Sequence, residues 1–348
     1  MEKKRILYLD YMRVTALFSV ILLHVSVIDW DKFPVNSLNW QVFNAFDGLV
    51  RFCVPVFVMI SGAFFLDKDR EITLKRLFSH NILRIVTAFV FWSALYAVIC
   101  TIVEENNTID GSVIKYFVAS VIYGHYHMWF LFTIVGLYLI TPFLRKITVD
   151  KKLTEYFIVL SVVFANLPKI LVLSPALDEV VGKILNKTNM FFVLGYAGYF
   201  VLGHYLHTYE IKREYKVTAY LMGAISSIAT IVGNSYTSLK AGTAQEAFFD
   251  YLMPTVLFSS IMVFLIFKDR AASFEQEKKK FIVSMSKLTF GMYLIHDIFI
   301  IAFKNMGLST VIVSPIVMIP LVAIIIFLLS YVATLLINKI PILNKFII

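Results

Sequence analysis

Apolar stretches long enough to cross a membrane follow one another along the chain, with short polar loops between them. A helix needs about 17–25 mostly apolar residues to span the hydrocarbon core of a bilayer. Ten stretches fit, at residues 7–28, 47–66, 83–103, 127–144, 154–173, 190–206, 216–234, 249–267, 287–306 and 311–337. The last holds Pro315 and Pro320, which predict a kink or a tilt. The pattern therefore predicts an all-α polytopic membrane protein with about ten transmembrane helices.

Basic residues are distributed unevenly among the loops that this pattern defines. With a cytoplasmic N-terminus, the cytoplasmic segments hold 23 Lys and Arg and the outer loops hold 7; Arg13 and Arg51 complete the 32. An excess of Lys and Arg marks cytoplasmic loops, so we expect both termini in the cytoplasm. The formal net charge of +9 is then a consequence of topology, and we expect no nucleic acid among the partners.

Composition points to the same class of protein. The chain is 59% hydrophobic and 16% charged, against about 45–50% apolar and about 25% charged residues in soluble proteins. Cys53 and Cys100 lie in apolar runs without metal-ligand spacing and are expected as small buried residues. The N-terminus resembles a signal peptide, but Asp10 and Arg13 inside a long apolar run predict a retained helix. We expect one membrane-embedded domain over residues 1–348, without an appended soluble domain, in the plasma membrane.

Two costly polar side chains lie inside the first predicted span, Arg13 and His24. Eleven positions are almost three helical turns, so both face the same side, about 16 Å apart along the axis. A charged residue inside a spanning helix costs about 2.5–3.5 kcal/mol and needs a polar partner or a cavity. Two interpretations stay open: a polar groove along the depth of the membrane, or an Arg13–Asp10 pair beside a hydrogen-bonded core histidine.

Four basic side chains gather before and at the start of the third span: Lys75, Arg76, His80 and Arg84. Such a cluster can bind a polyanion through charge-assisted hydrogen bonds. The alternative is anchoring at the cytoplasmic membrane surface, which explains Lys75 and Arg76 better than it explains Arg84, because Arg84 lies deeper in the apolar run.

The outer half of the membrane domain holds further polar residues. Asp47 and Arg51 are four positions apart on the second span and can pair with each other. Trp129, at the start of the fourth span, is expected as an interface anchor. His296 and Asp297 lie near the midplane of the ninth span, and either a functional site or a structural network of the two residues accounts for them. His125 and His127 are two positions apart, which does not place both on one helical face, so we expect no metal site.

Four segments resemble the acyltransferase-3 family of integral membrane acyltransferases. The opening LDYMRVTALFSVILLHV has the family's arginine, ten residues and a histidine, here Arg13 and His24. VPVFVMISGAFFL (54–66) resembles the family's second span, HMWFLFTIVGLYLITP (127–142) its Trp-Phe-Leu span, and LTFGMYLIH (288–296) its Gly-x-Tyr-Leu-x-His span. The four occur in the family's order, and the resemblance extends over essentially the whole chain.

The resemblance implies an activity. Members of the family move acyl groups, usually acetyl, from cytoplasmic coenzyme A thioesters to hydroxyls of surface carbohydrates. It implies His24 as the catalytic histidine, with Arg13 as its motif partner. His24 could act as a general base on the acceptor hydroxyl or as an acylated nucleophile. The expected partners are acyl-CoA on the cytoplasmic side, a carbohydrate or lipid-linked sugar acceptor, and the lipid bilayer.

The family also often has Arg-x-x-Arg at the start of the third span. In HNILR the second arginine is Arg84, but the first position is Asn81. His80 or Arg76 would supply the missing cation, and with Lys75 these residues are expected to bind the phosphates of acetyl-CoA. Further support of the site is expected from four polar residues, three of which (all but Asp47) could stabilise an oxyanion: Asp47, Arg51, Tyr293 and His296.

A second class of function also fits a membrane protein with intramembrane polar groups and proline-kinked spans. A transporter or flippase of lipid-linked sugars needs both features. No inverted repeat of the kind common in transporters is visible in the sequence. Basic residues at only one end of the polar groove are better explained by an anionic donor that enters from one side of the membrane. We therefore expect an acyl-CoA-dependent O-acyltransferase without a metal cofactor. The acceptor, the acyl group and the oligomeric state, including a homo-oligomer, stay open.

Overall fold

The computed structural model of the chain describes residues 5–103, 111–188, 191–274 and 279–347. These residues form helices, with no strand among them; 83% of the structure is helical. The longer helices are α1 (Leu7–Ser26), α2 (Leu38–Val50), α3 (Cys53–Phe65), α5 (Leu83–Val103), α6 (Gly111–Tyr123), α7 (Trp129–Ile147), α8 (Lys151–Ser161), α12 (Phe191–Thr208), α13 (Arg213–Ala241), α14 (Pro254–Asp269), α16 (Lys279–Asn305) and α17 (Pro315–Asn338). The shorter ones are α4 (Leu74–Arg76), α9 (Leu167–Leu171), α10 (Pro175–Leu177), α11 (Lys183–Thr188), α15 (Ala271–Phe274) and α18 (Pro341–Phe346).

Within the described residues, nine helical segments are long and apolar enough to cross a membrane: Leu7–Lys32, Leu38–Phe65, Leu74–Ile102, Phe117–Ile147, Lys151–Leu171, Arg213–Ala241, Ala247–Asp269, Lys280–Asn305 and Pro315–Asn338. Each overlaps one of the ten predicted spans. The other predicted span, 190–206, coincides with the 18-residue helix α12. The prediction of an all-α, multi-pass membrane protein is therefore confirmed.

Helix α12 packs backbone to backbone against α3. A Cβ atom added at Gly62 of α3 would lie 1.7 Å from the carbonyl oxygen of Phe200, and one added at Gly203 of α12 would lie 2.1 Å from that of Met59. Only a residue without a side chain allows this approach, so the two glycines fix how closely the helices pack.

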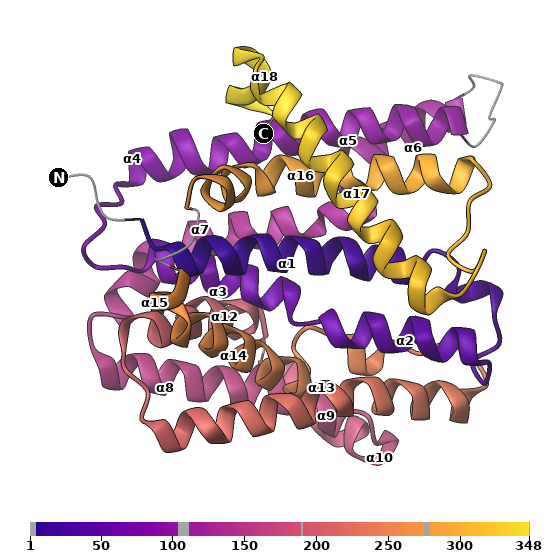
Figure 1. Ribbon diagram of the computed structural model, residues 1–348. Helices are drawn as coiled ribbons and strands as arrows, with labels where there is room; N and C mark the ends of the chain where they lie inside the picture. The colour runs from indigo at the N-terminus through magenta and orange to yellow at the C-terminus, as the bar shows by residue number, and fades with distance from the viewer. Residues whose placement is uncertain (1–4, 104–110, 189–190, 275–278, 348) are drawn as a thin grey trace.

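The second predicted span, 47–66, lies almost entirely within the longer segment Leu38–Phe65, which begins earlier than predicted and is interrupted. The chain there makes two helices, α2 and α3, which are separated at Arg51 and Phe52. Pro55 lies in the first turn of α3, where its ring cannot fit against the carbonyl of a helical residue four positions earlier, which is Arg51. The helix must therefore break at this arginine. Pro315 similarly begins α17, and Figure 1 shows that α17 crosses α1 obliquely, in line with the predicted tilt.

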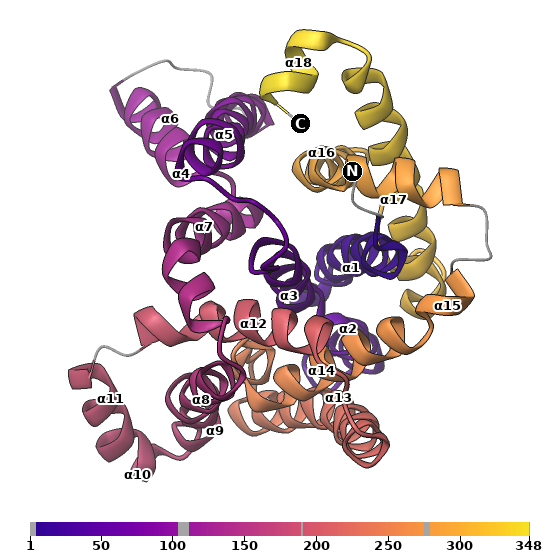
Figure 2. The same cartoon turned by 90° about the vertical axis from the view of Figure 1, so that its left-hand side faces the viewer.

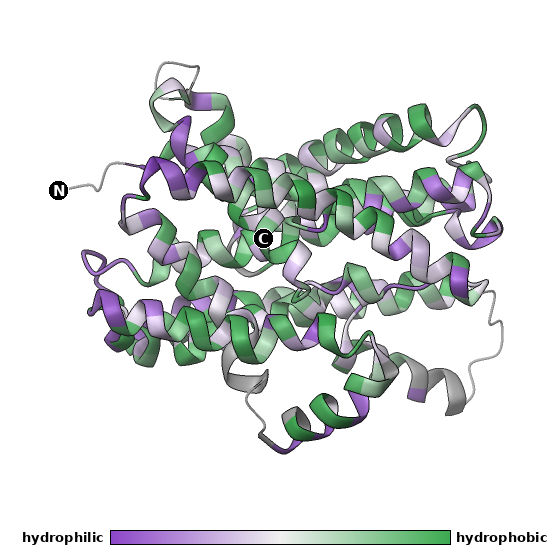
Figure 3. Ribbon diagram, turned by 90° about the horizontal axis from the view of Figure 1, so that it is seen from below, coloured by the Kyte–Doolittle hydropathy of each residue, from purple (hydrophilic) through white to green (hydrophobic). Residues whose placement is uncertain are grey.

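Helix α1 lies in the interior of the bundle. It packs against α2, α3, α16 and α17, and Figure 2, which looks along the helices, shows it between α3 and α17. Met12, Leu17 and Ile21 of α1 are completely buried. Figure 3 shows hydrophilic residues mainly toward the two ends of the helices and hydrophobic residues between them. Arg13 and His24 therefore lie on a helix enclosed by other helices, and both are partly buried.

Candidate functional site

One cavity of about 1170 Å³ contains both polar residues of α1 in its lining. Side chains of α1, α3, α5, α7 and α16 form its walls. Basic groups line one end: Arg5, Arg13, His80, Arg84 and Lys287. Imidazole and aromatic groups line the other: His24, His127, Trp129, Tyr251 and Tyr293. Of the two interpretations of the first span, the structure thus bears out the polar groove.

At the basic end, Asp10 is held by Arg5 rather than by Arg13. Arg5 Nε lies 2.6 Å from Asp10 Oδ2, and this hydrogen bond raises the pKa of Arg5 above its ordinary value. Ser286 donates to Asp10 Oδ1 at 2.6 Å, and Arg13 Nη1 lies 3.5 Å from the Ser286 hydroxyl. Arg13 therefore reaches Asp10 only through Ser286, and its charge lies beside the cavity.

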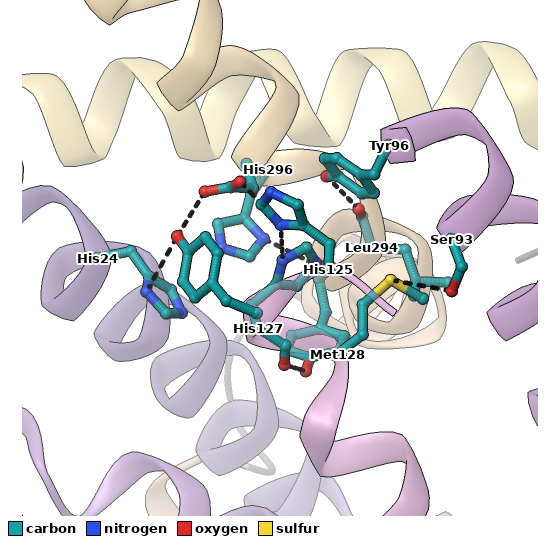
Figure 4. A network of polar contacts seen from close by, with 11 residues as sticks. His24, Ser93, Tyr96, His125, His127, Met128, Leu294 and His296 are labelled. Carbon is teal, nitrogen blue, oxygen red and sulfur yellow. Dashed lines mark hydrogen bonds and ion pairs between the residues drawn. The ribbon is translucent and has the colours of Figure 1, made fainter. Parts of the chain in front are cut away.

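His24 is connected to α16 through Tyr126 (Figure 4). The Tyr126 hydroxyl donates to Asp297 Oδ1 at 2.6 Å, and the same oxygen lies 3.5 Å from His24 Nδ1. Because the tyrosine O–H donates its hydrogen bond to the carboxylate, the tyrosine oxygen can accept a hydrogen bond from the N–H of His24 Nδ1. That arrangement selects the neutral tautomer in which His24 Nε2 carries a lone pair.

Two buried histidines stand beside His24. The ring of His296 is centred 5.2 Å from that of His24, and the ring of His127 lies 5.0 Å from His296. His296 Nδ1 lies 2.6 Å from the carbonyl oxygen of Tyr293, so that nitrogen carries the proton and donates it. Tyr293 in turn donates its hydroxyl proton to the carbonyl of His127. Hydrogen bonds to backbone carbonyl oxygens thus fix the side chains of His296 and Tyr293 beside His24.

Asp47 and Arg51 form the ion pair that their spacing predicts. Arg51 Nη2 donates to Asp47 Oδ2 at 2.6 Å, and the Asp47 side chain is completely buried. Arg51 also donates to the Phe249 carbonyl and lies over the Phe249 ring, 4.3 Å from its centre. In the part of the chain that the structure describes, Arg51 and His296 are not in the lining of the cavity, whereas Tyr293 is.

The four basic residues expected to bind the donor, at the basic end of the cavity, are divided between two places. His80 and Arg84 line the cavity, while Lys75, Arg76 and His80 line a neighbouring recess of about 350 Å³. A π-helical segment, Leu77–Ile82, connects the two groups. His80 is the residue that both hollows share.

Several residues at the site were assigned no function from the sequence. Tyr126 lies on a 3-10 turn, Tyr126–Met128, just before α7, where no helical periodicity could place it. The same turn brings His125 Nδ1 to 3.1 Å from His127 Nδ1, so the expectation that they lie apart is wrong. Trp129 lines the cavity and stacks on Tyr251 at 5.7 Å, whereas its position in the sequence predicted an interface anchor.

Residues 6–335 match the family model described as an acyltransferase domain, that of the acyltransferase-3 family. The match covers almost the whole chain, so the chain belongs to this family and is a membrane acyltransferase. The resemblance of the four motifs is thereby confirmed. Neither the curated proteins nor the solved structures contain a match to the chain.

Proposed function

We propose that the protein transfers an acyl group, expected to be acetyl, from cytoplasmic acyl-CoA to a hydroxyl of an extracytoplasmic or lipid-linked carbohydrate. The observation that carries this proposal is the single cavity shared by Arg13, Arg84 and His24. Cations at one end suit the phosphates of a donor, and an imidazole at the other suits acyl chemistry. Membership of the acyltransferase family favours this function over transport of lipid-linked sugars.

The donor would enter from the basic end. His80 and Arg84 would bind the phosphates, with Lys75 and Arg76 nearby as further positive charge. The pantetheine arm would then pass Arg13 toward His24, about 16 Å further along α1. The positive-inside distribution of Lys and Arg supports a cytoplasmic location for this end and for both termini.

His24 would act as the general base. Its Nε2 takes the proton of the acceptor hydroxyl while the hydroxyl oxygen attacks the thioester carbonyl carbon. The tetrahedral intermediate collapses, the carbon–sulfur bond breaks, and the thiolate of coenzyme A takes the proton from the imidazolium. Tyr126 and Asp297 would stabilise the charged ring and keep it oriented, as the third member of a catalytic triad does. Of the three side chains considered for the oxyanion, only Tyr293 lines the cavity. It would have to exchange its hydrogen bond to the His127 carbonyl for one to the oxyanion, because a tyrosine hydroxyl has a single proton to donate.

The test of this function is a thermal melt of the purified protein in detergent with acetyl-CoA, with coenzyme A and without ligand. Binding at a hundredfold excess over the dissociation constant stabilises the folded state by about 2.7 kcal/mol. We expect a higher melting temperature with acetyl-CoA, a smaller rise at high salt, because ions screen exposed cations, and a smaller rise for Arg84→Ala. A melting temperature that responds to a lipid-linked sugar but not to acetyl-CoA would support the transporter instead.

The acceptor is identified separately. Mass spectrometry of surface glycans from cells with and without the protein should reveal a mass difference of one acyl group on the acceptor. Glycans with identical acylation in both strains would contradict a carbohydrate acceptor.

A further inference from the structure

A second cluster of polar groups lies next to Tyr126, the tyrosine that contacts His24. It consists of His125, His127 and Asp297. One donor atom from each residue lies within 4.8 Å of the other two. His127 and Asp297 are almost completely buried, and the His125 side chain is 16% exposed. A carboxylate and two imidazoles so deep in a protein require a partner that satisfies their lone pairs.

The distances within the cluster resemble those between ligands of one metal ion. His125 Nδ1 lies 3.1 Å from His127 Nδ1 and 3.2 Å from Asp297 Oδ2. A tetrahedral ion bound at about 2.0–2.1 Å holds its ligand atoms about 3.3–3.4 Å apart. The two measured separations are close to this value, and one donor atom of each of the three residues lies within 4.8 Å of the other two.

Protons alone satisfy this arrangement poorly. A proton on His125 Nδ1 would have to serve two acceptors at once, the His127 nitrogen and the Asp297 oxygen. A proton on both imidazole Nδ1 atoms would bring two N–H groups together. Among the described residues, Asp297 Oδ2 has no well-aligned hydrogen-bond donor, although it is buried. A cation in the centre would use one lone pair from each of the three atoms.

We propose that His125, His127 and Asp297 bind one divalent transition-metal ion. Two imidazole nitrogens and one carboxylate oxygen are a ligand set typical of Zn²⁺, with a fourth position for water. The other oxygen of the Asp297 carboxylate accepts the hydrogen bond of Tyr126, which is how outer residues commonly orient a metal-binding carboxylate.

The ion would have a positioning role. It would join the turn that carries His125 and His127 to α16, which carries Asp297, two segments about 170 positions apart in the chain. Tyr126 lies between the two histidines in sequence, so the ion would fix the tyrosine that contacts His24. This inference is independent of the donor and the acceptor in the proposed function.

The experiment measures metal content and needs no activity assay. The full-length protein is purified in detergent with a tag that contains no histidine, and bound metals are measured by mass spectrometry. We expect one ion per chain, or uptake of one Zn²⁺ or Co²⁺ per chain on titration, with the intense visible absorption of four-coordinate Co²⁺. Zn²⁺ should also raise the melting temperature.

Variants locate the ion. His125→Gln and Asp297→Asn should lose the bound metal, the Co²⁺ spectrum and the Zn²⁺-dependent rise in melting temperature. The control His80→Asn replaces an exposed histidine at the basic end of the cavity. It should keep the bound metal, the Co²⁺ spectrum and the Zn²⁺-dependent rise in melting temperature. Zn²⁺ that leaves the wild-type melting temperature unchanged, together with no bound metal, would overturn the proposal, as would a metal that both ligand variants keep.

Discussion

Tyr126 donates a hydrogen bond of 2.6 Å to Asp297, a carboxylate 171 positions later in the chain. The same hydroxyl oxygen lies 3.5 Å from His24 Nδ1. Three segments that are remote in sequence therefore meet at one imidazole. In the proposed function this contact determines which nitrogen of His24 faces the reacting groups.

Replacing His24 should remove activity and leave the fold intact. The His24→Gln variant keeps a polar side chain of similar length but has no titratable nitrogen, and the loss of a general base lowers the rate about 10²–10⁴-fold. The measurement is the acyl ester content of surface glycans at equal amounts of membrane-inserted protein. Undiminished acylation by this variant would exclude His24 as the base.

The Tyr126 hydroxyl should contribute to rate and not to donor binding. Tyr126→Phe keeps the ring and removes only the oxygen that contacts His24 and Asp297. A hydrogen bond to a charged group contributes about 1.5–3 kcal/mol, so we expect kcat to fall about tenfold to a hundredfold with an unchanged dissociation constant for acetyl-CoA.

A matched control for this variant is Tyr123→Phe, which removes the hydroxyl of another exposed tyrosine shortly before the same turn. Equal kcat values for the wild type and Tyr126→Phe would show that the Tyr126 hydroxyl does not contribute to the catalysed reaction.

Arg13 should act on the donor through its geometry as well as its charge. Arg13→Ala is expected to weaken acetyl-CoA binding by about 1.5–3 kcal/mol, the contribution of a hydrogen bond to a charged group. Arg13→Lys should recover only part of this loss, because an ammonium does not reproduce the planar guanidinium. Calorimetric titration of both variants with acetyl-CoA gives the comparison, and full recovery in Arg13→Lys would reduce the role to charge alone.

The contact between α3 and α12 should be intolerant of any added side chain. Gly62→Ala would place a methyl group 1.7 Å from the Phe200 carbonyl oxygen, whereas nothing lies within 4 Å of a Cβ at Gly136. Overpacking of this kind costs about 1–3 kcal/mol. Gly136→Ala should instead be neutral or stabilising, since alanine favours a helix by up to about 1 kcal/mol over glycine. Thermal melts of Gly62→Ala and Gly136→Ala test this difference. Equal melting temperatures would show that α3 and α12 move apart at little cost.

Cysteine labelling of intact cells tests the orientation. On a background with Cys53→Ala and Cys100→Ala, a cysteine at Lys68 should resist a membrane-impermeant reagent and one at Lys240 should react. Both positions are exposed and lie in opposite end regions of the bundle. The reverse pattern would place the N-terminus outside and the basic end of the cavity with it.

Much of this molecule follows from local sequence. Runs of apolar residues determine where helices form, and the spacing of Arg13 and His24 predicted a shared face because an α-helix repeats every 3.6 residues. The Asp47–Arg51 pair is equally local. Tyr126 and Asp297 could not be paired in this way, because they meet only after α7 and α16 pack.

The irregular segments explain the remaining differences. A 3-10 turn brings His125 and His127 together where an α-helix would separate them. Pro55 divides the second span at Arg51, a break that the hydropathy of the segment does not reveal. A short turn or a proline changes the direction of side chains without changing the average hydrophobicity on which the prediction of spans depends.

The interior position of α1 has a consequence for biosynthesis. This helix emerges from the ribosome before the other helices described here, yet the partners that enclose it include α16 and α17, which follow more than 250 positions later in the chain. Until those helices are inserted, Arg13 and His24 lack part of the wall that shields them from lipid, at about 2.5–3.5 kcal/mol for the arginine. The polar stripe therefore destabilises α1 in the incomplete bundle, and the site assembles only after α16 and α17 have been inserted.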